Sequence, residues 1–325
     1  MTSLDRGHSA LDALDAGDRA TAVARPAGRS ENTAAVPRPR RSRDSPLTTV
    51  SPASRVFVLA IMSLFAVYFL APVWWLLVAA TKGQGEIFSG NGFWFSRHFA
   101  LVHNVQTLFE AQGGIYSRWL LNSLLYAVGG GIVATLLASM CGYALAKLPF
   151  PGREAVFGTV LAAVLLPAPV LAIPLYLVFS YTHVVNTFWS VFIPSIVSPF
   201  GVYLSRIYAA SSVPDQLIEA GRLDGASELR IFGIGVRLMA PAMVTIFLFQ
   251  FVAIWTNYLL PSLMLANDKL QPVTVGLVSW RELQGYPISY TTVVTGAFVS
   301  VVPVVAMFLS LQSFWSKGLA TGSVK

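Results

Sequence analysis

Charged residues are scarce in this sequence. Only 11% of its 325 residues are Asp, Glu, Lys or Arg, whereas soluble globular domains carry about 25%. Four long stretches contain none of these residue types: 56–81, 119–146, 155–205 and 238–267. A helix needs about 20 predominantly apolar residues to cross about 30 Å of hydrocarbon. The composition therefore excludes a soluble globular domain and predicts a membrane protein.

Cysteine is almost absent as well. Cys141 stands alone in an apolar stretch, so no intrachain disulfide and no Cys/His metal site is expected, and we interpret it as a small packing residue. The apolar stretches also lack paired carboxylates and His/Asp/Glu clusters. This absence argues against a proton-driven carrier, which usually has ionisable residues at the membrane midplane, and against an enzyme embedded in the membrane. We expect no cofactor in this chain.

The N-terminal region differs from the rest of the chain. Residues 1–54 are rich in Ala, Arg, Asp, Ser and Pro and show no apolar periodicity, which predicts a disordered tail. No apolar core of a standard signal peptide is present in it. The apolar run that starts near Val56 is long enough to be a retained span. Residues 55–325 are therefore predicted to form one transmembrane domain.

The apolar stretches predict an all-α membrane protein with six transmembrane helices. Helices, rather than open sheets, satisfy every backbone polar group within lipid. The six expected spans are 55–80, 119–146, 155–180, 187–208, 238–262 and 291–315.

The distribution of basic residues predicts the orientation. With both termini in the cytoplasm, 17 Lys and Arg residues fall on the inner side and 5 on the outer side, as the positive-inside rule requires. The net charge of +7 then reflects topology and contact with anionic lipid, and not nucleic acid. The loop 207–237, between the fourth and fifth spans, becomes the main polar segment on the cytoplasmic side after the tail.

This cytoplasmic loop has the residues of two short helices. Pro214 suits a first helical turn and Asp215 suits the positive end of the helix dipole. Gly225 can end the first helix, and Asp224 or Ser227 can cap the second. The expected result is a helical hairpin that exposes a small, smooth surface at Ala220-Gly221 to a groove on another protein.

At this point the sequence resembles a known family. Glu219-Ala220-Gly221 followed by Asp224-Gly225-Ala226-Ser227 looks like the EAA loop of bacterial ABC-importer permeases, and is most similar to the carbohydrate type related to maltose-transporter permeases. The resemblance covers nearly all of the chain after residue 55. Other segments that carry it are Gly142–Lys147, Phe150–Arg153, Ile173–Tyr176, and Trp255–Asn257 with Pro261.

The resemblance implies a mechanism and a set of partners. The loop would dock in a cleft of an ATPase subunit, and the closure of two ATPase subunits would switch the membrane helices between inward- and outward-facing states. A second permease and an extracytoplasmic sugar-binding protein would complete an importer in the bacterial inner membrane, with ATP and Mg²⁺ in the ATPases alone. The residues expected to couple to the ATPase are Glu219, Ala220, Gly221, Asp224, Gly225, Ala226 and Ser227.

Two departures from the family pattern concern this loop. Gly221 stands where the family has a second Ala, which exchanges one small residue for another. The family also places a Leu-Pro pair after the position of Ile231, and here only Pro241 remains. The resemblance therefore does not specify the angle at which the loop enters the fifth span.

Four residues are candidates for the substrate pathway. Asn257 and Tyr258 carry uncharged polar and aromatic groups that suit sugars, although a polar cap at the end of the fifth span is an equal alternative. Pro167 and Pro174 interrupt backbone hydrogen bonds in the third span, and such breaks leave carbonyl groups that can line a cavity. A polyamine or glycerol phosphodiester permease remains an alternative to a sugar permease, and a stand-alone secondary carrier is a further one.

Small residues also recur along the second span. Ala134, Ala138 and Gly142 follow one another at intervals of four and form a stripe typical of close helix packing in membranes. We expect this stripe to pack within the chain, with contact to a partner permease as the alternative.

Overall fold

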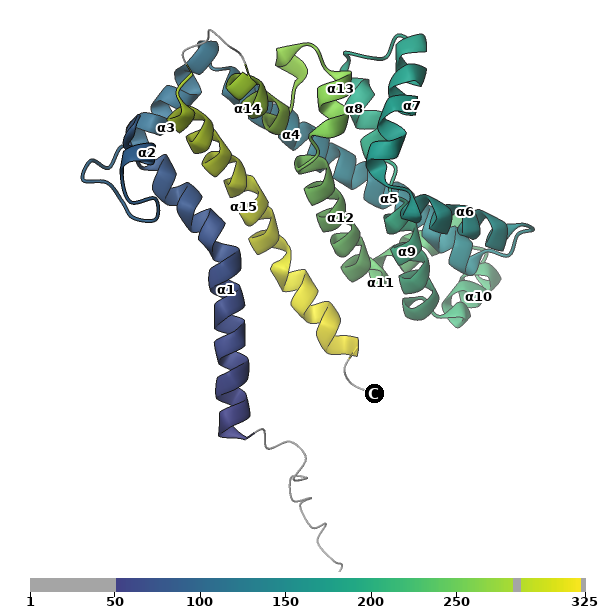
Figure 1. Cartoon of the computed structure of the whole chain (residues 1–325). Coiled ribbons are helices and arrows are strands. Elements are labelled where there is room, and N and C mark those ends of the chain that lie inside the picture. The colour runs from purple at the N-terminus through teal and green to yellow at the C-terminus, as the bar shows by residue number, and fades with distance from the viewer. Residues whose placement is uncertain (1–50, 283–287, 323–325) are drawn as a thin grey trace, which may run out of the picture. The chain divides into compact units, whose positions relative to one another are not determined.

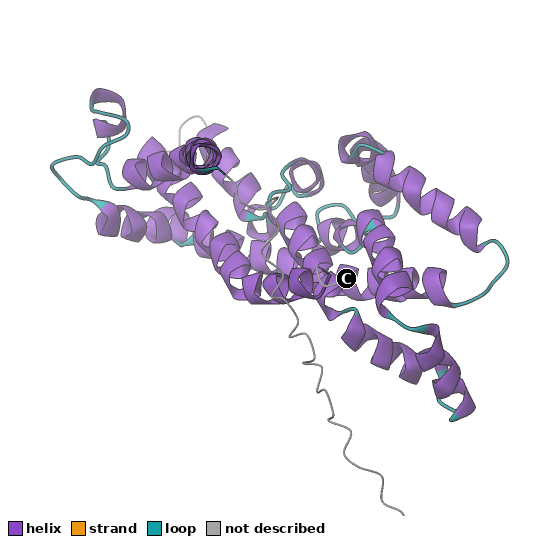
Figure 2. Cartoon of the chain, turned by 90° about the horizontal axis from the view of Figure 1, so that it is seen from below, coloured by secondary structure: helices purple, strands orange, loops and turns teal. Residues whose placement is uncertain are grey.

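A computed structural model describes residues 51–282 and 288–322, and in this part of the chain it contains helices and no strand (Figures 1 and 2). The longer helices are α1 (Pro52–Ala80), α3 (Leu101–Glu110), α4 (Ile115–Leu124), α5 (Gly130–Lys147), α6 (Arg153–Leu165), α7 (Ala168–Tyr181), α8 (Phe188–Ser195), α9 (Pro199–Ser212), α10 (Asp215–Leu223), α11 (Glu228–Leu238), α12 (Ala240–Trp255), α14 (Val273–Glu282) and α15 (Tyr290–Gly322). The shorter elements are α2 (Glu86–Ser89), η2 (Ala111–Gly113), η3 (Leu125–Gly129), α13 (Leu259–Met264) and η4 (Asp268–Leu270).

The chain divides into two units, Met1–Leu59 and Ala60–Lys325. In the first unit only the beginning of α1 is described. The predicted disordered tail otherwise lies outside the described residues, but α1 begins at Pro52, slightly before the predicted start of the first span. All contacts discussed below lie within the second unit.

The helices support a membrane protein with four to six candidate spans. Four are long and apolar enough by themselves: Pro52–Ala80, Ile115–Lys147, Phe188–Ser212 and Tyr290–Gln312. Two bent helix pairs pass the same test only when each pair is counted as one span. The prediction of six spans corresponds to the upper end of this range.

The third predicted span is divided sharply, in contrast to the continuous helix expected over 155–180. Its two halves, α6 and α7, differ in direction by 106°. Leu166 and Pro167 are extended, with ψ of 125° and 124°, because a proline disfavours helical geometry in the residue before it and cannot donate a backbone hydrogen bond. Pro174 lies inside α7 without ending that helix. The two prolines therefore have different effects, and Pro167 marks the break.

The entry to the fifth span is also bent. α11 and α12 differ by 78° in direction, and the turn falls at Met239, whose side chain is fully buried. Pro241 occupies the first turn of α12, where its missing N–H costs no helical hydrogen bond. This geometry answers the question that the missing Leu-Pro pair left open.

The second span lies at the centre of the helices near the polar loop and packs against several of them. It runs from α4 through a π-helical segment, η3, into α5. Ala134 and Ala138 are buried, and a Cβ atom on Gly142 would lie 2.5 Å from Cβ of Ser205 in α9. The predicted packing of this stripe within the chain is confirmed, because the small residues let α5 and α9 approach closely.

A second, aromatic core holds the other end of α4. Trp119 and Trp280 pack with ring centroids 4.7 Å apart, and Gly276 of α14 approaches Trp119 so closely that no Cβ could fit between them. The Asn122 side chain donates hydrogen bonds of 2.9 Å to the carbonyls of Lys269 and Gln271. The segment 268–282 is thereby fixed on α4.

Candidate functional site

The polar loop forms a hairpin of two helices, α10 and α11, which we call the α10–α11 hairpin (residues 215–238). Pro214, with φ of −65°, precedes α10, and Asp215 places a carboxylate in its first turn, where it complements the helix dipole. The prediction of two short helices separated at Gly225 is confirmed.

The turn between the two helices is a Schellman motif. The N–H of Ala226 donates to the carbonyl of Gly221 (2.9 Å), and the N–H of Gly225 donates to the carbonyl of Arg222 (3.0 Å). Gly225 has φ of +73°, a left-handed conformation that glycine adopts without steric cost. Ser227 takes the N-cap position of α11, but its side chain makes no capping hydrogen bond.

Two contacts lock the helices to each other. Nε of Arg222 lies 2.7 Å from Oε1 of Glu228, and this hydrogen bond raises the pKa of the Arg222 guanidinium. A Cβ atom on Gly221 would lie 3.0 Å from Cγ1 of the buried Ile231. The hairpin is a pre-shaped unit because each helix is held by the other.

Most of the residues expected to couple to an ATPase lie on the free side of this hairpin. Five are exposed and two are partly buried. The exposed ones are Glu219, Ala220, Asp224, Gly225 and Ser227, and the partly buried ones are Gly221 and Ala226. Ala220 is thus exposed on the outside of the hairpin, whereas Gly221 faces α11. Of the two residues expected to form a smooth surface, only Ala220 therefore lies on the exposed side.

Two large apolar side chains on this surface were missed in the sequence. Leu223 is 89% exposed and Leu229 is 74% exposed, one on each side of the Gly225 turn. A leucine at the last position of a short helix, directly before Asp-Gly, was the available signal. Apolar side chains gathered at an exposed turn are typical of a protein contact.

The hairpin rests on the ends of α5 and α9. A buried apolar cluster joins the three parts, and we call it the hairpin seat. Its buried members are Tyr143, Ala209, Val213, Ile218, Ile231 and Met239. The ring of Tyr143 meets Phe232 edge to face at 5.1 Å, and Gly235 allows that ring to lie directly on α11. The hairpin is therefore packed directly on α5 and α9.

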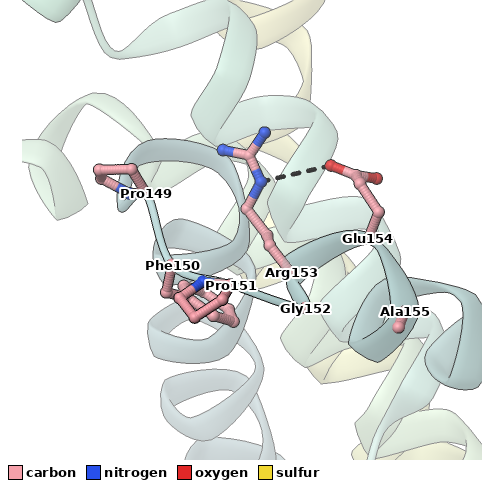
Figure 3. Close-up of a pocket in the computed structure, with 7 residues that line it drawn as sticks. All are labelled: Pro149, Phe150, Pro151, Gly152, Arg153, Glu154 and Ala155. Atoms are coloured by element: carbon pink, nitrogen blue, oxygen red, sulfur yellow. Dashed lines mark hydrogen bonds and ion pairs between the residues drawn. The ribbon is translucent and has the colours of Figure 1, made fainter.

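A pocket of about 600 Å³ lies at the turn between α5 and α6 (Figure 3). Its lining residues are Pro149, Phe150, Pro151, Gly152, Arg153, Glu154 and Ala155. The side chains of Arg153 and Glu154 point toward each other at 3.3 Å, and Glu154 also pairs with Arg206 at 2.7 Å. The polar groups of the pocket thus have partners within the chain, and they stabilise the turn.

The predicted substrate-pathway residues lie apart from the hairpin. Asn257 accepts a hydrogen bond from the N–H of Leu260 (3.4 Å), and its carbonyl accepts one from Thr274 (3.1 Å). Both bonds stabilise the turn into α13. Tyr258, Pro167 and Pro174 are exposed. The helices α7 and α13 contact each other.

The described residues contain no group of three or more His, Cys, Asp or Glu side chains that could hold a metal ion. Cys141 is partly exposed on α5. The exposed side chains of the hairpin include small, acidic, basic and apolar ones.

Comparison with known proteins identifies relatives of this fold. The model of the family described as "Binding-protein-dependent transport system inner membrane component" matches residues 134–318. The arabinooligosaccharides transport system permease protein AraQ of Bacillus subtilis is 31% identical over 283 residues, which cover 85% of this chain and 98% of AraQ. The diacetylchitobiose uptake system permease protein NgcG of Streptomyces coelicolor is 26% identical, over 82% of this chain and 87% of NgcG.

A solved structure shares the fold. A chain in the crystal structure of a bacterial ABC transporter involved in the import of the acidic polysaccharide alginate superposes with a TM-score of 0.71, covering 82% of this chain and 99% of that chain. The two sequences are 21% identical, so this likeness concerns the fold alone.

Proposed function

Since the chain belongs to the family of binding-protein-dependent transport system inner membrane components and is thus a multi-pass inner-membrane permease of an ABC importer, not its ATPase, we propose that it carries a carbohydrate. The names of its relatives support this cargo, because AraQ and NgcG are named for arabino-oligosaccharides and diacetylchitobiose. The match over 98% of AraQ extends the likeness to the whole length of a sugar permease.

In the proposed complex, the α10–α11 hairpin is the docking element for an ATPase. The observation that carries this assignment is the combination of a rigid hairpin, fixed by the Gly225 turn and the Arg222–Glu228 ion pair, with an exposed outer face. The distribution of basic residues supports a cytoplasmic position for the hairpin and for both termini. ATP and Mg²⁺ act in the ATPase subunits.

The partners follow from the same proposal. A second, related permease faces this chain across the pathway, two ATPase subunits bind on the cytoplasmic side, and an extracytoplasmic binding protein delivers the sugar. ATP-driven closure draws the docked hairpins together. The hairpin seat then transfers the movement to α5 and α9.

The test is uptake by the full transporter reconstituted in liposomes with its partner subunits and binding protein. Arabino-oligosaccharides, chitobiose derivatives, a polyamine and a glycerol phosphodiester form the substrate panel. ATP-dependent uptake of a sugar is expected. Uptake of the polyamine or the phosphodiester with no sugar uptake would contradict the carbohydrate assignment.

Two hairpin variants test the docking role. Glu219→Lys reverses an exposed charge, and Gly225→Pro removes the left-handed turn; both should abolish transport and binding-protein-stimulated ATP hydrolysis while the protein remains in the membrane. Glu110→Lys, at an exposed position of α3, and Gly233→Ala, on an open side of α11, are matched controls that should transport normally. Normal transport by Glu219→Lys and Gly225→Pro would contradict docking through this hairpin.

A further inference from the structure

The loop that follows α1 folds back onto the end of that helix. Nε1 of Trp74, in α1, donates to the carbonyl of Phe93 (3.0 Å). Nζ of Lys82, a residue that is only 2% exposed, donates to the carbonyl of Asn91 (2.6 Å). The N–H of Phe93 in turn donates to Oδ1 of Asn91 (3.0 Å). These bonds fix the beginning of the segment 91–99 on the end of α1.

The end of the same segment is fixed as well. The N–H of Ala100 donates to the carbonyl of Thr81 (2.8 Å). Nδ2 of the buried Asn104, in α3, donates to the carbonyl of Ala80, the last residue of α1 (2.8 Å). The segment 91–99 is therefore held against α1 at both of its ends, and the side chains that it exposes have a defined position.

These exposed side chains form a cluster of aromatic rings. The centroid of the Phe95 ring lies 5.6, 6.1 and 6.2 Å from those of Trp74, Trp94 and Phe99. Trp94 is 64% exposed and Phe99 is 62% exposed, and Phe93 beside them is 58% exposed. We call Trp74, Phe93, Trp94, Phe95 and Phe99 the aromatic platform. A contiguous exposed apolar surface of this kind is typical of a contact site.

The position of the platform on α1 favours lipid as its occupant. Trp74 follows Arg55, the last charged residue before it, by 19 positions, and about 20 apolar residues cross the hydrocarbon. Trp74 therefore lies where α1 leaves the hydrocarbon, and its ring contact with Phe95 continues the apolar surface of α1 onto the loop. Indole rings are enriched at this level of a bilayer, because they combine a large apolar body with an N–H donor.

The charge of the loop also fits a phospholipid headgroup. Arg97 and His98 are exposed within the segment that carries the platform, and no Asp or Glu occurs between Glu86 and Glu110. A guanidinium group beside exposed rings is able to pair with a phosphate while the rings lie among the upper acyl carbons. An acidic protein partner would match the charge, but it would not account for the continuity with a membrane-spanning helix.

We propose that the aromatic platform is a docking surface for phospholipid of the outer leaflet. The rings of Trp94 and Phe99 enter the interface between headgroups and acyl chains, and Arg97 pairs with a lipid phosphate. The loop between the first and second spans is thereby held on the membrane, together with the outer end of α1. This inference depends on the membrane class and the predicted orientation of the chain, and it is independent of the carbohydrate assignment.

Nitroxide labels on single cysteines test the platform in the complete transporter in nanodiscs, without the binding protein. In a Cys141→Ala background, Trp94→Cys and Phe99→Cys report on the platform. Thr107→Cys, at an exposed position of α3, is the control for water, and Phe65→Cys, at an exposed position of α1, is the control for lipid. Labels at 94 and 99 should collide more often with oxygen and less often with a water-soluble nickel chelate than the label at 107, because oxygen concentrates in lipid. Their ratios should lie between those of the two controls.

Collision ratios at positions 94 and 99 equal to the ratio at 107 would overturn the proposal. Immobilisation of these labels only after the external binding protein is added would identify a protein as the occupant and would overturn it too. Low collision with both reagents would show that another subunit covers the platform, which also contradicts docking on lipid.

A second measurement leaves the aromatic rings in place. The difference in fluorescence between the unmodified transporter and Trp94→Phe isolates the emission of the Trp94 indole. Lipids brominated on the acyl carbons nearest the headgroup should quench this emission, and aqueous iodide should not. Quenching by iodide without quenching by the brominated lipids would contradict a contact between Trp94 and the membrane.

The same emission tests the phosphate contact of Arg97. Brominated phosphatidylglycerol should be enriched about fivefold at Trp94 over brominated phosphatidylcholine, because one basic residue at the membrane surface attracts anionic lipid by about this factor. Arg97→Gln should remove the enrichment, and His103→Gln, at an exposed position of α3, should leave it unchanged. An enrichment that persists in Arg97→Gln would contradict the pairing of Arg97 with a lipid phosphate.

Discussion

The ammonium group of Lys147, the last residue of α5, lies 2.7 Å from Oδ1 of Asp215, the first residue of α10. The two residues are 68 positions apart in the sequence. The Lys147 side chain is only 6% exposed, whereas that of Asp215 is 74% exposed. This ion pair is a polar link between the α10–α11 hairpin and the second span, beside the apolar hairpin seat.

We predict that breaking this link weakens coupling. Asp215→Asn leaves the enclosed Lys147 ammonium without its carboxylate, at a cost of about 1 kcal/mol, and the amount of sugar imported per ATP hydrolysed should fall. The double charge exchange Lys147→Asp with Asp215→Lys should restore part of the lost sugar import per ATP hydrolysed. Asp268→Asn, an exposed carboxylate in η4, is the control. Unchanged stoichiometry in Asp215→Asn would show that the ion pair has no part in coupling.

A second prediction concerns the contact between Gly221 and Ile231. Gly221→Ala should be tolerated at a small cost, because the Ile231 side chain, whose Cγ1 would lie 3.0 Å from the new Cβ atom, has to move by only a few tenths of an ångström. Gly221→Val should displace α10 from α11 and lower transport. In a double-mutant cycle, Ile231→Ala, which removes both Cγ1 and Cδ1, should cost less stability in the Gly221→Ala background than in the unmodified protein; strict additivity would contradict the contact.

A third prediction concerns the crossing of α5 and α9. Gly142→Ala places a Cβ atom 2.5 Å from Cβ of Ser205 and 2.7 Å from the backbone nitrogen of Arg206, so the backbone itself has to move. We expect a loss of about 1–3 kcal/mol in stability and less protein in the membrane. Gly158→Ala, on α6 with open space around it, should have no such effect. Equal amounts and melting temperatures for the two variants would contradict this packing.

Local chemistry explains what could be predicted from the sequence. The α10–α11 hairpin depends on Pro214, Asp215 and Gly225, whose backbone preferences act over a few residues. The membrane class follows from charge-free stretches alone, because the cost of placing ionisable groups in lipid applies to each residue separately.

Features that depend on distant parts of the chain could not be predicted in the same way. Pro167 and Pro174 both lack a backbone N–H, but the span breaks at Pro167 and α7 continues through Pro174. The helices on either side of the break pack on different partners, α6 on α9 and α7 on α13. The Lys147–Asp215 pair and the contact of Gly221 with Ile231 depend on how the hairpin folds back on α5. The exposure of Leu223 could not be predicted from the spacing of apolar residues, because it depends on the direction in which α10 runs.

The central claim is that the exposed face of the α10–α11 hairpin binds an ATPase subunit, and crosslinking from Leu223 tests it most directly. Leu223 is 89% exposed, so a photoreactive amino acid there should leave the fold intact. In the assembled transporter we predict an adduct between this chain and the ATPase, with none from the same group at Phe88, which is 76% exposed in α2. An adduct with the external binding protein, or none with the ATPase, would contradict the account.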